Sequence, residues 1–93
     1  MTKVKLRYFA SIREALGRQG EEAVVKGDRV ADVVNWLVAN HGDKLIPSVL
    51  NSRGELQGEY RILHNGSIAS PGKMTKKIAD GDEIVLLPPV AGG

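Results

Sequence analysis

The segment Glu83–Leu87, EIVLL, carries apolar side chains at four consecutive positions. A strand with one face in water alternates apolar and polar residues. A strand that is apolar on both faces usually runs through the middle of a sheet, with other elements covering each side. The sequence therefore predicts a central strand at 83–87, within a chain whose 93 residues suffice for one domain.

Two further strands are predicted near the N-terminus. In 4–8, VKLRY, three apolar residues alternate with two basic ones, which indicates a half-buried strand. Phe9 follows and places an apolar ring on the basic face of that strand. The segment 21–27, EEAVVKG, reads as a second strand that pairs back on the first as a hairpin.

Two helices are also expected. SIRE, 11–14, matches a capping box with Ser11 at the helix start, and Gly17 can end this short helix. A longer helix is predicted to begin at an Asp28 cap and to stop at Gly42. Trp36 lies at the flank of its apolar stripe, where packing is the expected role. The stripe comprises Val30, Val33, Val34, Leu37 and Val38.

The second half of the chain is richer in turns. Residues 43–60 contain one proline and two glycines, which favours a short helix or turn around 45–50 followed by a loop. Asn65-Gly66 predicts a tight hairpin, and Asp80-Gly81 predicts another tight turn. Together these elements favour an α+β fold, in which one main helix packs on one face of a small mixed sheet.

Composition excludes several classes of function. The net charge is only +2 and, apart from GKMTKK, the basic residues are scattered, which disfavours nucleic-acid binding. There is no cysteine for a disulfide, a thiolate nucleophile or a thiolate zinc site. His41 and His64 have no ligand-like spacing, so we expect no metal site. No apolar run reaches a membrane span or a signal peptide, so a cytoplasmic location is expected.

The segment LLPPVAGG, 86–93, offers a chemical function of a different kind. Pro88-Pro89 favours an extended backbone, and two glycines without side chains fit a narrow channel. The reactive group is then the α-carboxylate of Gly93, a poor acyl donor until ATP converts it to an acyl-adenylate. No phosphate-binding glycine motif is present, so another enzyme must perform the activation. The sequence therefore predicts a carrier or substrate protein, with no bound cofactor, rather than an enzyme.

Three stretches resemble the MoaD/ThiS-type β-grasp sulfur carriers, which include the small subunit of molybdopterin synthase. They are KVKLRYFASIREALG at the start, the NG of the later hairpin, and ADGDEIVLLPPVAGG at the end. The resemblance covers nearly the whole chain, although 43–60 matches poorly. That longer middle is similar to the archaeal ubiquitin-like small modifier proteins and to the carrier that serves a cysteine synthase. The resemblance implies one ubiquitin-like β-grasp domain over 1–93, with 88–93 as a flexible tail.

The resemblance also implies partners and roles. An E1-like adenylyltransferase adenylates Gly93 with Mg-ATP, and a sulfur donor then converts the carboxylate to a thiocarboxylate. The molybdopterin synthase large subunit accepts the tail and passes the sulfur to a pterin precursor. Apolar side chains on the open sheet face dock both partners. The tail is expected to bind through Pro88, Pro89, Val90, Ala91 and Gly92, and the docking positions fall on Phe9, Ile68 and Leu87.

Other functions fit the same residues. A ubiquitin-like modifier would join Gly93 to lysines of target proteins through an isopeptide bond. A sulfur carrier could also serve cysteine synthesis or tRNA thiolation instead of molybdenum-cofactor synthesis. A plain binding module with an incidental tail is a third class, and it predicts that loss of 92–93 has no effect. The sequence does not separate these functions and does not indicate an oligomeric state.

Overall fold

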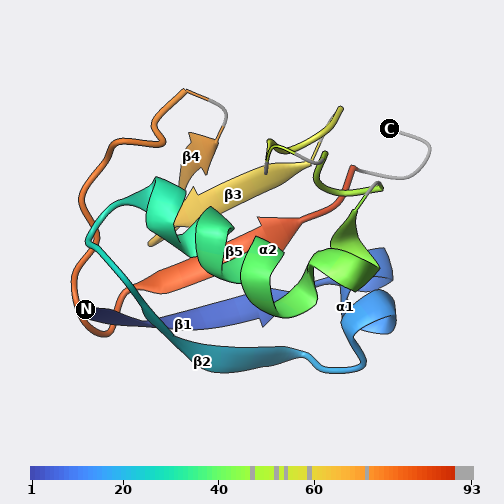
Figure 1. The fold of residues 1–93 in the computed structure, drawn as a ribbon, viewed down its shortest axis with the longest axis horizontal. Coiled ribbons are helices and arrows are strands. Elements are labelled where there is room, and N and C mark those ends of the chain that lie inside the picture. Colours follow the sequence, from blue (N-terminus) through green and yellow to red (C-terminus); the bar gives the residue numbers. More distant parts are fainter. Residues whose placement is uncertain (47, 52, 54, 59, 71, 90–93) are drawn as a thin grey trace.

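A computed structural model describes residues 1–46, 48–51, 53, 55–58, 60–70 and 72–89. These residues form a five-stranded sheet and two helices, whose arrangement is drawn in Figure 1. In chain order the elements are β1 (Thr2–Tyr8), α1 (Ala10–Leu16), β2 (Gly20–Val25), α2 (Val30–Leu45), β3 (Arg61–His64), β4 (Ser67–Ser70) and β5 (Glu83–Leu87).

The strand β5 occupies the centre of the sheet, as its apolar sequence predicts. The strand order is β2-β1-β5-β3-β4. β5 runs parallel to β1 and antiparallel to β3, while β1 and β2 form the predicted antiparallel pair. Ile84 and Leu86 are fully buried on the helix side, and Val85 is almost covered on the other side. The sheet is therefore mixed, which confirms the predicted α+β class.

The helix α2 covers one face of the sheet, and the short helix α1 lies at one end of it (Figure 1). The side chains that point from β1 toward α2 are buried, whereas those that point away are exposed. The core joins the helix stripe to the inner face of the sheet, and its largest fully buried members include Tyr8, Ile12, Leu37, Leu45, Leu50, Ile62, Ile84 and Leu86. In the part of the chain that is described, neither helix has the length and apolar character needed to span a membrane.

The predicted starts of both helices are wrong. α1 begins at Ala10 after an extended Phe9, so Ser11 lies inside the helix and its side chain makes no cap. α2 begins after Arg29 instead of Asp28, and the carboxylate of Asp32 accepts the Arg29 N–H at 2.9 Å. The cap is thus supplied by Asp32, in the first turn of the helix, whose side chain reaches back to the backbone N–H of the N-cap residue as in one half of a capping box.

The end of α2 also differs from the prediction. The helix passes Gly42 and ends at Leu45, which is fully buried. An interior glycine costs only about 1 kcal/mol relative to alanine, and burial of the final turn outweighs it. Ile46 is extended, as expected for a residue that precedes a proline in the sequence.

The predicted turns are present where the structure describes them. Asn65 and Gly66 both have positive φ, 49° and 88°, and join β3 to β4 as a two-residue hairpin. Asp80 and Gly81 form the turn that leads into β5, where the Asp80 carboxylate accepts the Lys3 N–H. Among the residues described after Leu45, Ile46, Ser48 and Val49 lie in turns and Leu50 forms an isolated bridge with Leu56, so they adopt the turn that was one of the two alternatives for 45–50.

A polar junction ties α2 to the sheet. One carboxylate oxygen of Glu21 accepts the Tyr8 hydroxyl at 2.6 Å and lies 2.6 Å from Nε2 of His41, while Arg18 reaches the other oxygen at 2.8 Å. Burial raises the pKa of Glu21, but the hydrogen bonds from Tyr8 and His41 and the nearby positive charges outweigh it, so the pKa lies below its ordinary value. Burial and this carboxylate together raise the pKa of Tyr8.

This junction makes stability depend on pH. Because the pKa of Glu21 is lower in the folded state, its stabilisation is complete above the ordinary value of 4.5 and is lost as pH falls through the folded value. We expect the free energy of unfolding, measured by urea titration at several pH values, to decline progressively in acid. Glu21→Gln should cost about 1–2 kcal/mol at pH 7 and flatten that decline. An unchanged slope in the variant would contradict this origin of the acid sensitivity.

Candidate functional site: the open sheet face

The central strand carries the chain out at the α1 end of the sheet. Leu86 is level with Tyr8 of β1, and Leu87 pairs with Arg61 of β3. Pro88 is then half-buried and Pro89 exposed. The predicted tail positions Val90 to Gly93 lie outside the described residues. The described part of the tail thus leaves the sheet from its middle strand.

The three predicted docking residues lie on the face of the sheet that α2 does not cover. Phe9 and Leu87 are each one position beyond the Tyr8–Leu86 pair, so they are level with each other. Phe9 is 36% exposed and Leu87 is half-buried. Ile68 lies on the edge strand β4 and is 56% exposed, more than Phe9.

Two further apolar residues complete this surface, and sequence reasoning missed both. Ile68 pairs with Leu63, and Leu63 pairs in turn with Val85 of the central strand. Paired residues on neighbouring strands share a face, so the three side chains form a continuous apolar row across β4, β3 and β5. The alternation of Ile62 and His64 with Leu63 in RILH could have indicated Leu63. We call Phe9, Leu63, Ile68, Val85 and Leu87 the docking surface, after the role that the sequence predicts for three of them.

Charged side chains flank the docking surface. The guanidinium of Arg7 lies 5.5 Å from the centre of the Phe9 ring and 3.4 Å from the Glu83 carboxylate. Both partners of that ion pair are about half exposed, so it adds little to stability. Lys3 and Lys5 are exposed on the same face of β1. An apolar centre with a basic flank is suited to a partner whose surface is apolar and acidic.

On the opposite face, a polar pair links the end of β3 to the residue before β5. His64 is buried, and its Nε2 lies 2.6 Å from a carboxylate oxygen of Asp82. That oxygen also accepts the Ala79 N–H at 2.9 Å. The hydrogen bond with His64 is the main cause that holds the pKa of Asp82 below its ordinary value. Among the residues that the structure describes, no group of three or more acidic or histidine side chains is arranged to hold a metal ion.

The mixed sheet with one crossing helix and a tail that leaves the central strand defines a ubiquitin-like β-grasp protein. A model of the ThiS family matches residues 6–93, and the chain belongs to that family. The family groups small ubiquitin-like sulfur carriers and modifiers, and the chain is accordingly not an enzyme.

Relatives support the same assignment. Small archaeal modifier protein 1 of Haloferax volcanii is 38% identical over 88 residues, which span 94% of this chain and 97% of the relative. A crystal structure of that protein superimposes with a TM-score of 0.82 at 34% identity, covering 98% of this chain and 99% of the other. The putative molybdopterin converting factor subunit 1 of Pyrococcus furiosus gives 0.77 at 29% identity, covering 97% and 100%.

Proposed function

We propose that this chain is a sulfur carrier whose reactive group is the carboxylate of Gly93, activated by an E1-like adenylyltransferase. Membership of the ThiS family over residues 6–93 is the observation that carries this proposal. The position of β5 supports it, because the chain leaves the sheet from this central strand at Pro88 and Pro89, directly before VAGG in the sequence. The docking surface lies beside the start of this tail, where one partner can contact both.

The proposed chemistry requires the partner to supply every reagent. The carboxylate attacks the α-phosphate of Mg-ATP, forms an acyl-adenylate and releases pyrophosphate. A hydrosulfide ion supplied by a donor then attacks the acyl carbon, and AMP leaves with the electron pair of the broken bond. The product is a thiocarboxylate. With no cysteine and no phosphate-binding glycine motif, this chain contributes the acyl group and the docking surface.

The pathway that receives the sulfur forms a further part of the proposal. Molybdopterin synthesis, with a synthase large subunit as acceptor, is supported by the similarity to the Pyrococcus furiosus protein. Conjugation to target lysines is the second candidate, because the curated relative at 38% identity is named a modifier. In that reaction a lysine amine replaces the sulfur nucleophile on the same acyl-adenylate.

Intact-mass measurement separates the two functions. The protein, isolated from cells that contain its E1-like enzyme, should show the mass gain of one oxygen replaced by sulfur if it is a sulfur carrier. Conjugates of higher mass that contain a lysine–Gly93 isopeptide should accumulate if it is a modifier. Finding neither species under any growth condition would contradict the proposal.

Phe9 gives the docking surface its sharpest test. Phe9→Ala should weaken binding to the E1-like enzyme about tenfold or more, because exposed aromatic rings commonly dominate such contacts. The free energy of unfolding should change by less than about 1 kcal/mol, since the ring is 36% exposed. Titration calorimetry and urea unfolding provide the two measurements.

Val24→Ala is the matched control, because Val24 is 50% exposed on the same face but lies on the far edge strand β2. It should bind the enzyme as tightly as the unmodified protein. A large loss of stability in Phe9→Ala, with unchanged binding, would show that the ring is a core residue.

A further inference from the structure

The edge strand β2 has one unpaired side. In β1, the backbone groups of Lys3 and Lys5 bond to the turn before β5, so those of the alternate residues point toward β2. These alternate residues, Thr2, Val4 and Leu6, pair with Val25, Ala23 and Glu21 of β2. In a strand, the backbone groups of successive residues point to opposite sides. The N–H and C=O of Glu22 and Val24 therefore point outward, and within the described chain no hydrogen bond reaches them.

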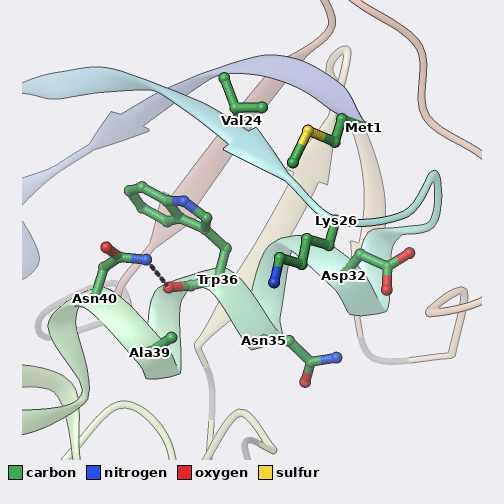
Figure 2. A pocket seen from close by; sticks show the side chains of 8 residues that line it. All are labelled: Met1, Val24, Lys26, Asp32, Asn35, Trp36, Ala39 and Asn40. Atoms are coloured by element: carbon green, nitrogen blue, oxygen red, sulfur yellow. Dashed lines mark hydrogen bonds between the residues drawn. The ribbon is translucent and has the colours of Figure 1, made fainter.

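A groove runs beside this free edge. Figure 2 shows Trp36 on α2, set below the strand, with Lys26 and Met1 near the strand's end. The groove has a volume of about 520 Å³. Its apolar lining residues include Val24, which is half exposed, and Trp36, which is half-buried. The lining consists of Met1, Val24, Lys26, Asp32, Asn35, Trp36, Ala39 and Asn40.

The charges along the β2 edge are complementary to those on the same edge of a second copy of the chain. Glu22 and Lys26 are both exposed, they lie two residues to either side of Val24, and neither forms an ion pair among the described residues. If two such edges pair antiparallel with Val24 opposite Val24, each Glu22 is in register with the Lys26 of the other copy. Lys26 directly follows the last residue of β2, and its long side chain can reach that carboxylate. Opposite charges on directly facing residues stabilise a pair of strands.

We propose that the β2 edge pairs with the β2 edge of a second copy of this chain, forming a symmetric dimer. A two-fold axis perpendicular to the sheet relates the copies, so the contact is isologous and closed. The two Val24 residues exchange both N–H···O=C bonds, and the sheets join into one. Both α2 helices lie on the same face, so the two grooves meet and each Trp36 loses exposed area.

The dimer leaves the docking surface free. β2 and β4 are opposite edges of the sheet, and the tail leaves from β5 between them. The dimer can therefore present two tails at once, and it does not depend on the proposed function. One strand pair and two indole rings form a small contact, and contacts below about 1,200 Å² are typically transient. Self-association should therefore be weak and depend on concentration.

Sedimentation velocity of the full chain, at concentrations up to about 1 mM, tests the dimer. Val24→Lys should abolish association, because it places two ammonium groups opposite each other. Glu22→Lys and Lys26→Glu should each weaken the dimer about tenfold at low salt, because each turns both attractive contacts into repulsive ones. The double variant Glu22→Lys with Lys26→Glu reverses both charges and should restore the original constant within about threefold.

Lys73→Glu is the matched charge control, since Lys73 is exposed and its N–H bonds to Ala69 of β4, at the opposite edge. It should leave the dimer unchanged, and thermal unfolding should confirm that every variant folds. A chain that stays monomeric throughout the range, or a double variant as weak as the single ones, would overturn the proposal. The proposal would also be overturned if the chain is monomeric and Val24→Lys abolishes binding to a different protein, because the β2 edge would then be the binding site for that protein. None of these outcomes bears on the reaction of Gly93.

Discussion

Deletion of Gly93 is expected to abolish both thiocarboxylate formation and conjugation. The shortened chain still ends in a glycine carboxylate, but that group lies one residue, about 3.5 Å, short of its place in the partner's active site. A displacement of about 1 Å at a reacting centre can reduce a rate by about 100-fold. The loss should therefore exceed 100-fold when adenylation is followed as pyrophosphate release by the E1-like enzyme.

Stability and docking should survive the same deletion. Within the described chain, the last member of the hydrophobic core is Leu86, and the docking surface ends at Leu87, both well before the deleted residue. The midpoint of urea unfolding and the affinity for the enzyme should remain within error of the full chain. Gly93→Ala is a smaller change at the same residue, because it keeps the chain length and the carboxylate and adds one methyl group where the partner's active site must accept the tail. Full activity of the deletion variant would refute the assignment of the carboxylate.

The sequence was most informative where burial is decided locally. Four consecutive apolar residues at 84–87 located the central strand, and Asn65-Gly66 located a hairpin, because a strand core and a tight turn each depend on few neighbours. The helix starts were wrong for a physical reason. Phe9 and Arg29 occupy the N-cap positions although neither has a good capping side chain, and their extended backbones follow from the preceding strand and turn.

Tertiary pairing also determines what the sequence could not indicate about the site. Phe9 was identified as an apolar ring on a polar face, and the structure places it there. Leu63 and Val85 join that surface only because β3 lies between β4 and β5, an order that single-sequence periodicity does not contain. The groove beside β2 depends likewise on how α2 crosses the sheet, so Trp36 gave no sign of it beyond a flanking position.

Gly27→Ala is expected to produce a large loss of stability, although Gly27 lies outside the hydrophobic core. Gly27 joins β2 to α2 with φ of +110°, a conformation that side chains rarely adopt, and an added Cβ would collide with the carboxylate of Asp32. That carboxylate caps α2 through the Arg29 N–H. Backbone strain of about 1–3 kcal/mol and a lost cap of about 0.5–2 kcal/mol together predict a loss of about 1.5–5 kcal/mol in the free energy of unfolding, measured by urea titration.

Two controls separate strain from collision. Gly81 has a similar φ of +87° with nothing near an added Cβ, so Gly81→Ala should cost only about 1–2 kcal/mol, the strain alone. Asp32→Ala removes the colliding carboxylate together with the cap. In that background Gly27→Ala should therefore cost no more than Gly81→Ala does, and the cycle measures the coupling between the two residues. If the losses of the two single variants simply add in the double variant, the Asp32 carboxylate moves away from the added methyl group at no cost. The start of α2 at Val30 would then not depend on this cap.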